Sequence, residues 1–423
     1  MGVTASKFEG RALPVVMFTV FLDAIGIGVL VPLFPQLFYK VFLPAGYSIH
    51  SGYIALGWLT GMYALMQFIS TPILGQLSDR FGRKRVLGLS LLTTALGYAL
   101  LALGIMAKNI PLLFAARAIA GIGGGNVSVA RAIVADVSSA EHRTRNFGLI
   151  GAGFGMGFVF GPFFGARFSV PHASFLSMHT PSWFTTATPL WITAGIGLIN
   201  IALLIARLPE TNKYRNSTRI VWSKSLSNIR KAATSRSLRT VLTTELAFWG
   251  GFTFFTSFLA LQLVSRLHYS TVGIGNLFAY IGICIAVAQG ALVPVLAKRF
   301  KNYQVVRSGM IAMGGSLLLQ LLVHNTAELL IVGALIAFCY SVLMTNVSAL
   351  VSSSAGPEIQ GEVLGIEASV QAIGESVPAI IAGYIATIGI NTPNLIGALI
   401  ILFGGLLFTV FYRSRREVLH QDN

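Results

Sequence analysis

Residues 52–85 read GYIALGWLTGMYALMQFISTPILGQ followed by LSDRFGRKR, and this stretch decides the class of fold. Residues 52–76 carry no charged side chain, and about 20 apolar residues are enough for an α-helix to cross a bilayer. The next nine residues include four basic ones: Arg80, Arg83, Lys84 and Arg85. A long apolar run that ends in a basic loop is typical of a membrane-spanning helix.

The composition extends this interpretation to the whole chain of 423 residues. Hydrophobic residues make up 54% and charged residues only 10%, against roughly 25% charged residues in an average globular protein. So few charges cannot cover the surface of a soluble protein of this size. The two cysteines, Cys284 and Cys339, are too few for a disulfide scaffold. The sequence therefore predicts an integral membrane protein with several spans.

Twelve apolar runs long enough to cross a bilayer follow one another along the chain, and they predict an all-α fold of twelve membrane helices. Their expected limits are 12–38, 52–76, 85–107, 111–136, 146–166, 189–207, 239–264, 271–297, 304–323, 327–352, 362–388 and 394–412. The polar, basic stretch 208–238 separates them into an N-terminal bundle, 1–207, and a C-terminal bundle, 239–423. Two similar six-helix halves are a recurrent plan of transporters.

The net charge of +16 is explained by topology. With twelve spans, 24 of the 30 Lys and Arg residues fall on the side that holds both termini. Basic loops face the cytoplasm, so both termini are expected there, in a cell (inner or plasma) membrane. Nucleic-acid binding is not needed to account for the charge.

The loop from Gly75 to Arg85 resembles the signature loop of the major facilitator superfamily. In it, Gly75 is expected to let two helices approach and Gly82 to permit a tight turn. Arg83 needs a carboxylate partner, and we expect a gating cluster at the cytoplasmic end that includes the start of the eleventh span. The gating residues are Gly75, Asp79, Arg80, Gly82, Arg83 and Asp136.

Two further segments are similar to the tetracycline-type drug–proton antiporters of that superfamily. The first span reads Leu22-Asp23-Ala24-Ile25-Gly26-Ile27-Gly28, and the fifth carries a signature typical of antiporters at Gly157, Gly161, Pro162 and Gly165. Glycines at every fourth residue also form a smooth helix face, which packs closely against a neighbour without any role in antiport. Both interpretations stay open.

Three positions depart from the family pattern. Ala166 stands where the antiporter signature has a second glycine. Gly97 and Met313 stand where tetracycline exporters have carboxylates in the third and ninth spans. These departures make tetracycline itself doubtful as a substrate and assign proton coupling to other acids.

Ionisable residues at bilayer depth cost roughly 2.5–3.5 kcal/mol on insertion scales, so they are functional candidates by default. Asp23 lies midway along the first span, and Arg117 lies near the external end of the fourth. Glu245, near the start of the seventh span, fits a structural ion pair nearly as well as a functional role. Arg131 is expected to extend toward the interface or to pair with Asp136 or another loop acid.

The eleventh span carries Glu367, Gln371 and Glu375 at intervals of four residues, which places all three on one helix face. Packing against lipid or a dry core explains such a face poorly, so we expect it to line a water-filled cavity and to hold the proton or cation site. Trp249, one turn after Glu245, is the best aromatic candidate for this cavity.

The sequence thus predicts secondary active export of a small amphipathic compound in exchange for protons. An uptake symporter or facilitator for a nutrient or metabolite is the alternative, and a transport-inactive receptor or scaffold is a third interpretation. We expect a monomer in the lipid bilayer, with a small-molecule substrate and protons as partners and no nucleic acid. No enzyme signature, cofactor motif or metal-ligand spacing is present in the sequence.

Overall fold

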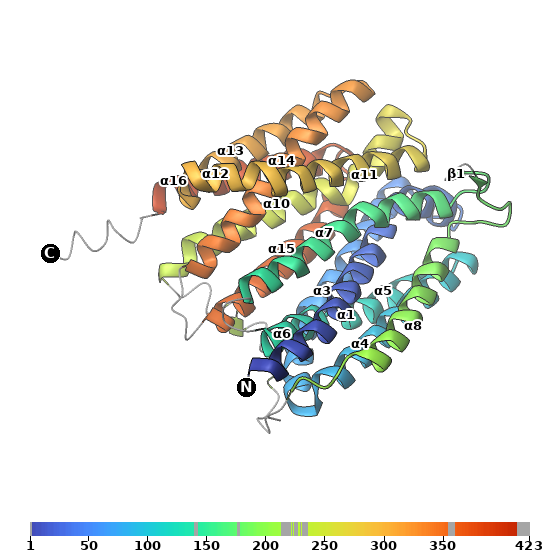
Figure 1. The fold of residues 1–423 in the computed structure, drawn as a ribbon. Coiled ribbons are helices and arrows are strands. Elements are labelled where there is room, and N and C mark those ends of the chain that lie inside the picture. Colours follow the sequence, from blue (N-terminus) through green and yellow to red (C-terminus); the bar gives the residue numbers. More distant parts are fainter. Residues whose placement is uncertain are drawn as a thin grey trace.

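The computed structural model of the protein describes residues 2–138, 143–175, 178–212, 221, 223, 227, 228, 230, 236–353 and 360–412. Almost all of these residues are helical (Figure 1). The two short strands β1 (Ser174–Phe175) and β2 (Met178–His179) pair antiparallel in the loop between α7 and α8.

The first half of the chain, called the N-terminal half below, contains the helices α1 to α8. Their bounds are α1 Gly2–Val29, η1 Val31–Leu33, α2 Phe34–Leu37, η2 Phe38–Phe42, α3 Ile49–Phe81, α4 Arg83–Met106, α5 Ile110–Gly124, α6 Val127–Val137, α7 Arg143–Phe168 and α8 Thr188–Arg207. Ser48 and Asn109 cap α3 and α5, because their side chains accept a hydrogen bond from the backbone three residues later.

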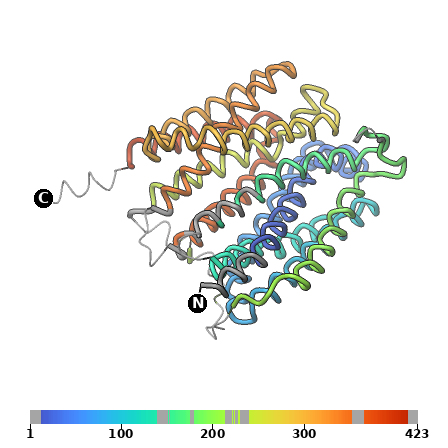
Figure 2. Tube along the Cα trace, viewed as in Figure 1, coloured from blue at the N-terminus to red at the C-terminus, as the bar shows by residue number. Residues whose placement is uncertain are grey.

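The second part, called the C-terminal half, contains the helices α10 to α16. Their bounds are α10 Arg236–Leu267, α11 Thr271–Val287, η3 Ala288–Leu292, α12 Val293–Arg299, α13 Asn302–Leu321, α14 Thr326–Ser353, α15 Gln360–Ile385 and α16 Thr392–Phe411. Figure 2 shows the two halves as blue-to-green and yellow-to-red groups of long, roughly aligned helices.

Each of the twelve expected spans coincides with one helix or with consecutive helices. Nine helical stretches within the described residues are long and apolar enough to cross a membrane. The long helices α7, α13 and α15 pack against them as parts of the same bundles. The twelve-helix, all-α class expected from the sequence is confirmed, whereas the division at 208–238 stays a prediction because most of that stretch lies outside the described residues.

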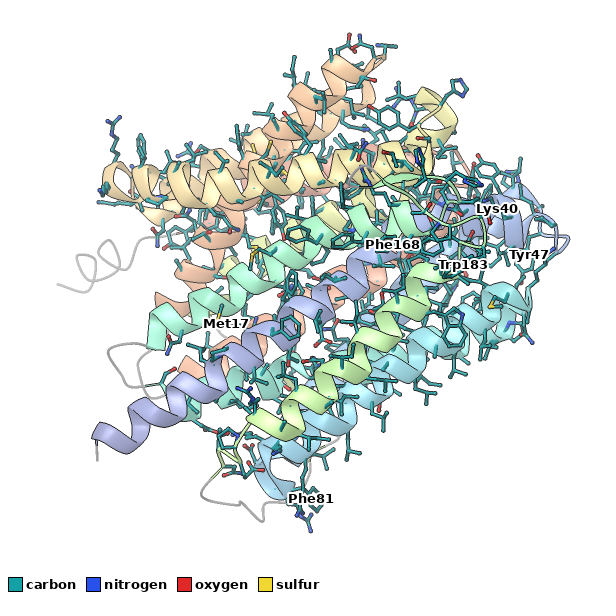
Figure 3. The ribbon with its side chains drawn as sticks, turned by 45° about the vertical axis from the view of Figure 1, so that its right-hand side comes forward. Met17, Lys40, Tyr47, Phe81, Phe168 and Trp183 are labelled. Carbon is teal, nitrogen blue, oxygen red and sulfur yellow. The ribbon has the colours of Figure 1, made fainter. Side chains whose placement is uncertain are left out.

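The bundle has two distinct ends. The strands β1 and β2 mark one, called the hairpin end; the start of α1 and the end of α16 lie at the other, called the termini end (Figure 1). Figure 3 places Lys40, Tyr47 and Trp183 at the hairpin end and Phe81 at the termini end.

The halves contact each other along two helix pairs, α3 with α15 and α7 with α11. These contacts are close toward the hairpin end: a Cβ added at Gly57 would lie 2.8 Å from Gly383 Cα. Trp58 Nε1 also donates to Tyr384 Oη at 3.1 Å. Small residues and a polar contact therefore close this end.

A second group of polar contacts closes the same end between α7 and α11. Arg167 donates to Asn276 Oδ1 at 2.7 Å, and its guanidinium lies over the Phe163 ring. The buried Gln36 Nε2 donates to Thr271 Oγ1 at 3.3 Å, which joins the end of the first span to the C-terminal half.

The same helix pair separates toward the termini end. On α7, Gly151 and Gly155 continue the face that contacts α11 through Val159, yet a Cβ at either glycine would meet nothing within 4 Å. Gly290 lies in η3, directly after α11, and a Cβ there would also meet nothing within 4 Å. The two halves are therefore closed at the hairpin end and apart at the termini end.

Candidate functional site

A cavity of about 410 Å³, including space open to solvent, lies between the two halves. Its lining residues come from α6, α10, α14 and α15: Arg131, Glu245, Phe248, Trp249, Met344, Val347, Ser348, Glu367 and Gln371. Five polar or charged side chains and four apolar or aromatic ones therefore face this space. Glu367, Gln371 and Trp249, three residues expected here from the sequence, share this cavity.

The two carboxylates of the cavity are nearly inaccessible. Glu245 is 2% exposed and Glu367 is 8% exposed. Glu367 accepts a hydrogen bond from Ser348 Oγ at 2.5 Å, whereas Glu245 Oε2 accepts none from the described residues. Arg131, the one basic residue among the described residues of this lining, interacts electrostatically with both carboxylates.

This arrangement corrects one expectation from the sequence. Asp136 pairs with Arg83, so the pair of Arg131 with Asp136, one of the alternatives expected for Arg131, is not formed among the described residues. Arg131 and Glu245 had no assigned place in the candidate site. The signal that could have found them is their depth in apolar runs together with their opposite charges.

The deeper part of the same helix face carries Glu375. Gln371 Nε2 donates to Glu375 Oε1 at 2.9 Å, so these two side chains form a continuous polar pair along α15. Trp249 lies in a group of rings with Phe248, Phe252 and Tyr340, whose closest centroids are 4.7 Å apart. One wall of the site is therefore polar and the neighbouring wall is aromatic.

Arg117 is buried at 4% exposure within the N-terminal half. Its Nε donates to Leu59 O at 2.9 Å and its guanidinium lies over the Tyr63 ring at 4.6 Å. Nη1 finds no hydrogen-bond acceptor among the described residues. A buried guanidinium that carbonyls and a ring satisfy only in part is a candidate for a functional charge.

Asp23 occupies a separate place in the N-terminal half. Asn126 Nδ2 donates to Asp23 Oδ2 at 2.6 Å. Asn126 lies in the break between α5 and α6, outside either helix. Asp23 also lines a small pocket formed by α1, α4 and α8, with Tyr98 and Asn200 among its neighbours. Asn126 is a further polar partner that the sequence did not indicate.

Tyr63 connects these two groups of residues. A Cβ added at Gly124 would touch the Tyr63 hydroxyl, the Arg117 guanidinium lies over the Tyr63 ring, and Asp23 and Glu375 lie near enough for their charges to act on the hydroxyl. The structure therefore brings the polar residues of α1, α5 and α15 to a common region around one buried tyrosine.

Arg83 lies at the centre of a charge cluster at the termini end. Its Nη1 is 2.6 Å from Asp79 Oδ1, and its Nε is 3.1 Å from Asp136 Oδ2. The same guanidinium donates to Ser78 Oγ at 2.6 Å. Arg80 is exposed and lies over the Phe81 ring instead. Two carboxylates from different helices thus hold one arginine.

The residues that follow α8 complete this cluster. Glu210 Oε1 accepts hydrogen bonds from the backbone N–H groups of Arg83 and Asn212. Thr211 Oγ1 donates to Asp136 Oδ2 at 3.2 Å, and Asn212 Nδ2 donates to Asp79 O at 2.7 Å. These contacts were not expected from the sequence. The expected contact of this cluster with the start of the eleventh span involves a region that borders residues 354–359, which lie outside the described residues, and it stays a prediction.

The two glycines of the loop have different roles. Gly82 has φ +102°, a conformation that favours glycine, and it ends α3 in the expected tight turn. A Cβ at Gly75 would lie 3.6 Å from Ser128 Oγ, an ordinary contact. The expectation that Gly75 is needed for a close helix approach is therefore wrong in this conformation.

The glycine stripe of α7 packs against α1. A Cβ at Gly157 would lie 2.6 Å from Phe21 O, and one at Gly161 would lie 2.7 Å from Ile25 O. Gly165 meets Val29 in the same way, and the Pro162 ring lies against Gly28. The stripe thus fits two neighbouring helices closely together, as the packing interpretation requires.

The three departures from the family pattern also have a structural place. The Ala166 Cβ fits against Gly275 of the C-terminal half, so the methyl group that replaces a glycine hydrogen packs against a residue without a side chain. A Cβ at Gly97 would lie 2.7 Å from Ala120 Cα, which leaves no room for a carboxylate. Met313 is fully buried in the apolar core of the C-terminal half.

Comparison with known proteins agrees with this architecture. A family model described as Major Facilitator Superfamily matches residues 16–374 and 292–423. The chain is 32% identical over 319 residues to the tetracycline resistance protein, class C, of Escherichia coli, and the matched region covers 72% of each of the two chains. It is 28% identical over 349 residues to major facilitator superfamily domain-containing protein 10 of Mus musculus, covering 77% of this chain and 72% of the relative.

Solved structures share the fold. The human organic anion transporter MFSD10 aligns with a TM-score of 0.71 and 24% identity over 95% of this chain and 99% of its own. A D-xylose–proton symporter aligns with a TM-score of 0.75 and 17% identity, covering 96% of this chain and 98% of its own. The chain is therefore a multi-pass membrane protein that belongs to the major facilitator superfamily, whose members are transporters and not enzymes.

Proposed function

We propose that the protein is a secondary active transporter that exports a small amphipathic compound in exchange for protons by alternating access. The observation that carries this proposal is the cavity between the halves, where the buried carboxylates Glu245 and Glu367 lie beside Trp249. Aromatic and polar side chains on neighbouring walls suit an amphipathic compound, and carboxylates suit a proton.

Alternating access is supported by the asymmetry of the two ends. The halves are closed at the hairpin end and apart at the termini end, with Gly151 and Gly155 facing open space. Two six-helix halves, 1–207 and 239–423, would rock about the central cavity, as in other transporters built from repeats. The cavity is complete within one chain, which fits a monomer.

Proton coupling is assigned to the acids of α15, with Asp23 as the candidate in the other half. Gln371 and Glu375 form a polar pair beside Glu367, and Tyr63 interacts with both Asp23 and Glu375. A carboxylate that releases a proton when substrate binds would link the two fluxes. The related tetracycline resistance proteins support export, and Gly157, Gly161, Pro162 and Gly165 resemble a signature typical of antiporters.

The cluster around Arg83 is proposed as the gate at the termini end. Asp79, Arg83 and Asp136 join the ends of α3, α4 and α6 within the N-terminal half while the termini end is open. Closure of this end would bring the cluster against the start of α15 in the other half. The positive-inside bias places this end in the cytoplasm of a cell membrane, the inner or plasma membrane. Impermeant thiol labelling of a cysteine at Asn423 tests the orientation: reaction in intact cells would reverse it.

Flux into everted membrane vesicles with an imposed pH gradient tests the function. The probes are tetracycline, the lipophilic cation tetraphenylphosphonium and the organic anion fluorescein. Accumulation that requires a gradient with an acidic vesicle interior supports export in exchange for protons. Efflux along the proton gradient would indicate the uptake symporter, flux without the gradient a facilitator, and no flux of any probe a receptor or scaffold.

A further inference from the structure

Among the described residues, Arg131 is the one member of the cavity lining that comes from the N-terminal half. It lies on α6, which packs against α1, α3, α4 and α7 of that half. Glu245 and Glu367 lie on α10 and α15, which pack against each other in the C-terminal half. A movement of one half against the other therefore changes the distance from Arg131 to both carboxylates, while the carboxylates keep their places relative to each other.

The carboxylates are poorly satisfied in the present state. Glu245 Oε2 has no hydrogen-bond donor among the described residues, the Trp249 indole is the one neutral donor that acts on the Glu245 carboxylate there, and Glu367 accepts from Ser348. No nitrogen of Arg131 comes within 4.0 Å of either carboxylate in the described part of the chain, where the ion pairs are those of Arg83 and Glu328. An uncompensated charge at this depth is costly, and a closer guanidinium would offset the cost.

We propose that Glu245, Glu367 and Arg131 form a coupling element across the two halves. When the carboxylates are ionised, they attract Arg131 and favour closure of the termini end. When a proton neutralises them, this attraction falls and the open arrangement gains population. By linkage, closure of the termini end in turn disfavours proton binding to the pair. The proposal rests on alternating access, because only a relative movement of the halves changes these distances.

Other charged groups around the pair do not replace this role. Among the described residues, the charges that act on Glu245 and Glu367 are each other and Arg131. Glu375 of α15 interacts instead with Gln371 and with Tyr340 of α14. Asp136 of α6 is held by Arg83, away from the cavity. The coupling therefore depends on three named side chains.

Electron paramagnetic resonance distances between the halves test the proposal. Cysteines replace Gly151 and Gly290, where an added side chain meets open space, in a background with Cys284→Ser and Cys339→Ser. Nitroxide labels on the full-length protein in lipid nanodiscs report the opening of the termini end. On acidification, we expect the ratio of open to closed populations to rise about tenfold, within the range of coupling typical of linked sites.

Variants assign this response to the three side chains. Arg131→Gln and the double variant Glu245→Gln with Glu367→Gln should each reduce the pH response to less than about twofold, whereas Arg131→Lys should keep most of it. Arg207→Gln, which removes an exposed positive charge of the N-terminal half outside the cavity, should leave the response unchanged. If Arg131→Gln does not fold, the carboxylate variants and Arg131→Lys decide the question.

A full pH response in Arg131→Gln, or in the carboxylate double variant, would overturn the proposal. The absence of any pH response in the parent protein would overturn it as well, even if vesicles still show proton-coupled flux. The reverse outcome, a pH response that needs Arg131 but no proton-coupled flux of any probe, would keep the coupling element and refute the proposed function. The two failures are therefore distinguishable.

Discussion

Asp79 supplies one of the two carboxylates that hold Arg83, and it does so from a half-exposed position. Asp79→Asn keeps the shape of the side chain but removes the charge. We expect slower transport with nearly unchanged probe binding, because the gate loses an ion pair while the cavity stays intact. Initial rates in everted vesicles and equilibrium binding of the same probe measure the two effects. Unchanged transport kinetics would count against the gate.

Glu375 offers a second test at the level of a single residue. Glu375→Gln keeps an acceptor for Gln371 but cannot titrate. We expect the variant to lose accumulation driven by a pH gradient and to keep exchange of labelled for unlabelled probe, which needs no net proton movement.

Glu367→Gln and Asp23→Asn are the matched comparisons for this test. If both glutamate variants retain gradient-driven flux while Asp23→Asn loses it, the coupling residue lies in the N-terminal half. The hydrogen bond from Asn126 makes Asp23 the first candidate there.

At the scale of an element, α7 serves two neighbours with two different faces. The face with Gly153, Gly157, Gly161 and Gly165 fits α1, and the face with Val159 and Ala166 meets α11 of the other half. One helix therefore combines a fixed contact within a half and a contact that opens toward the termini end.

Gly157→Ala and Gly155→Ala test the packing of these two faces independently. The methyl group at 157 would lie within 2.6 Å of Phe21 O, whereas the methyl group at 155 meets nothing within 4 Å. We expect Gly157→Ala to lower stability by about 1–3 kcal/mol through overpacking and Gly155→Ala to leave it nearly unchanged. Thermal unfolding of the purified proteins provides the measurement. Equal melting temperatures for the two variants would contradict the fixed contact.

At the scale of the whole molecule, closure at the hairpin end depends on small residues. Gly57→Leu would place a branched side chain against the backbone of Gly383 and force α3 and α15 apart at this end. We expect the population to shift toward a state that is open at the hairpin end and closed at the termini end. Labels at Gly151 and Gly290 should then report a shorter distance.

Gly195→Leu is the control for this prediction, since a Cβ at Gly195 meets nothing within 4 Å. It should leave the label distance as in the parent protein. An unchanged distance in Gly57→Leu, with the protein folded, would show that the α3–α15 contact does not set the conformational equilibrium.

The fold itself follows from the sequence with little help from tertiary contacts. A membrane helix must satisfy its own backbone and be about 20 apolar residues long, so each span is a local property that can be read from residues such as 52–76. The partners of Arg83 were predictable in the same way, because Asp79 lies one helical turn before it and Asp136 ends the fourth span.

Residues brought together from different spans could not be found by such local patterns. Arg131 and Glu245 come from opposite halves, and only the tertiary arrangement places α6 across the same cavity from α10 and α15. Asn126 reaches Asp23 because a helix break, not a periodic pattern, orients it. Span length and side of the membrane are set by local hydrophobicity and charge, whereas the pairing of buried charges depends on how the helices pack, and only the tertiary structure decides that.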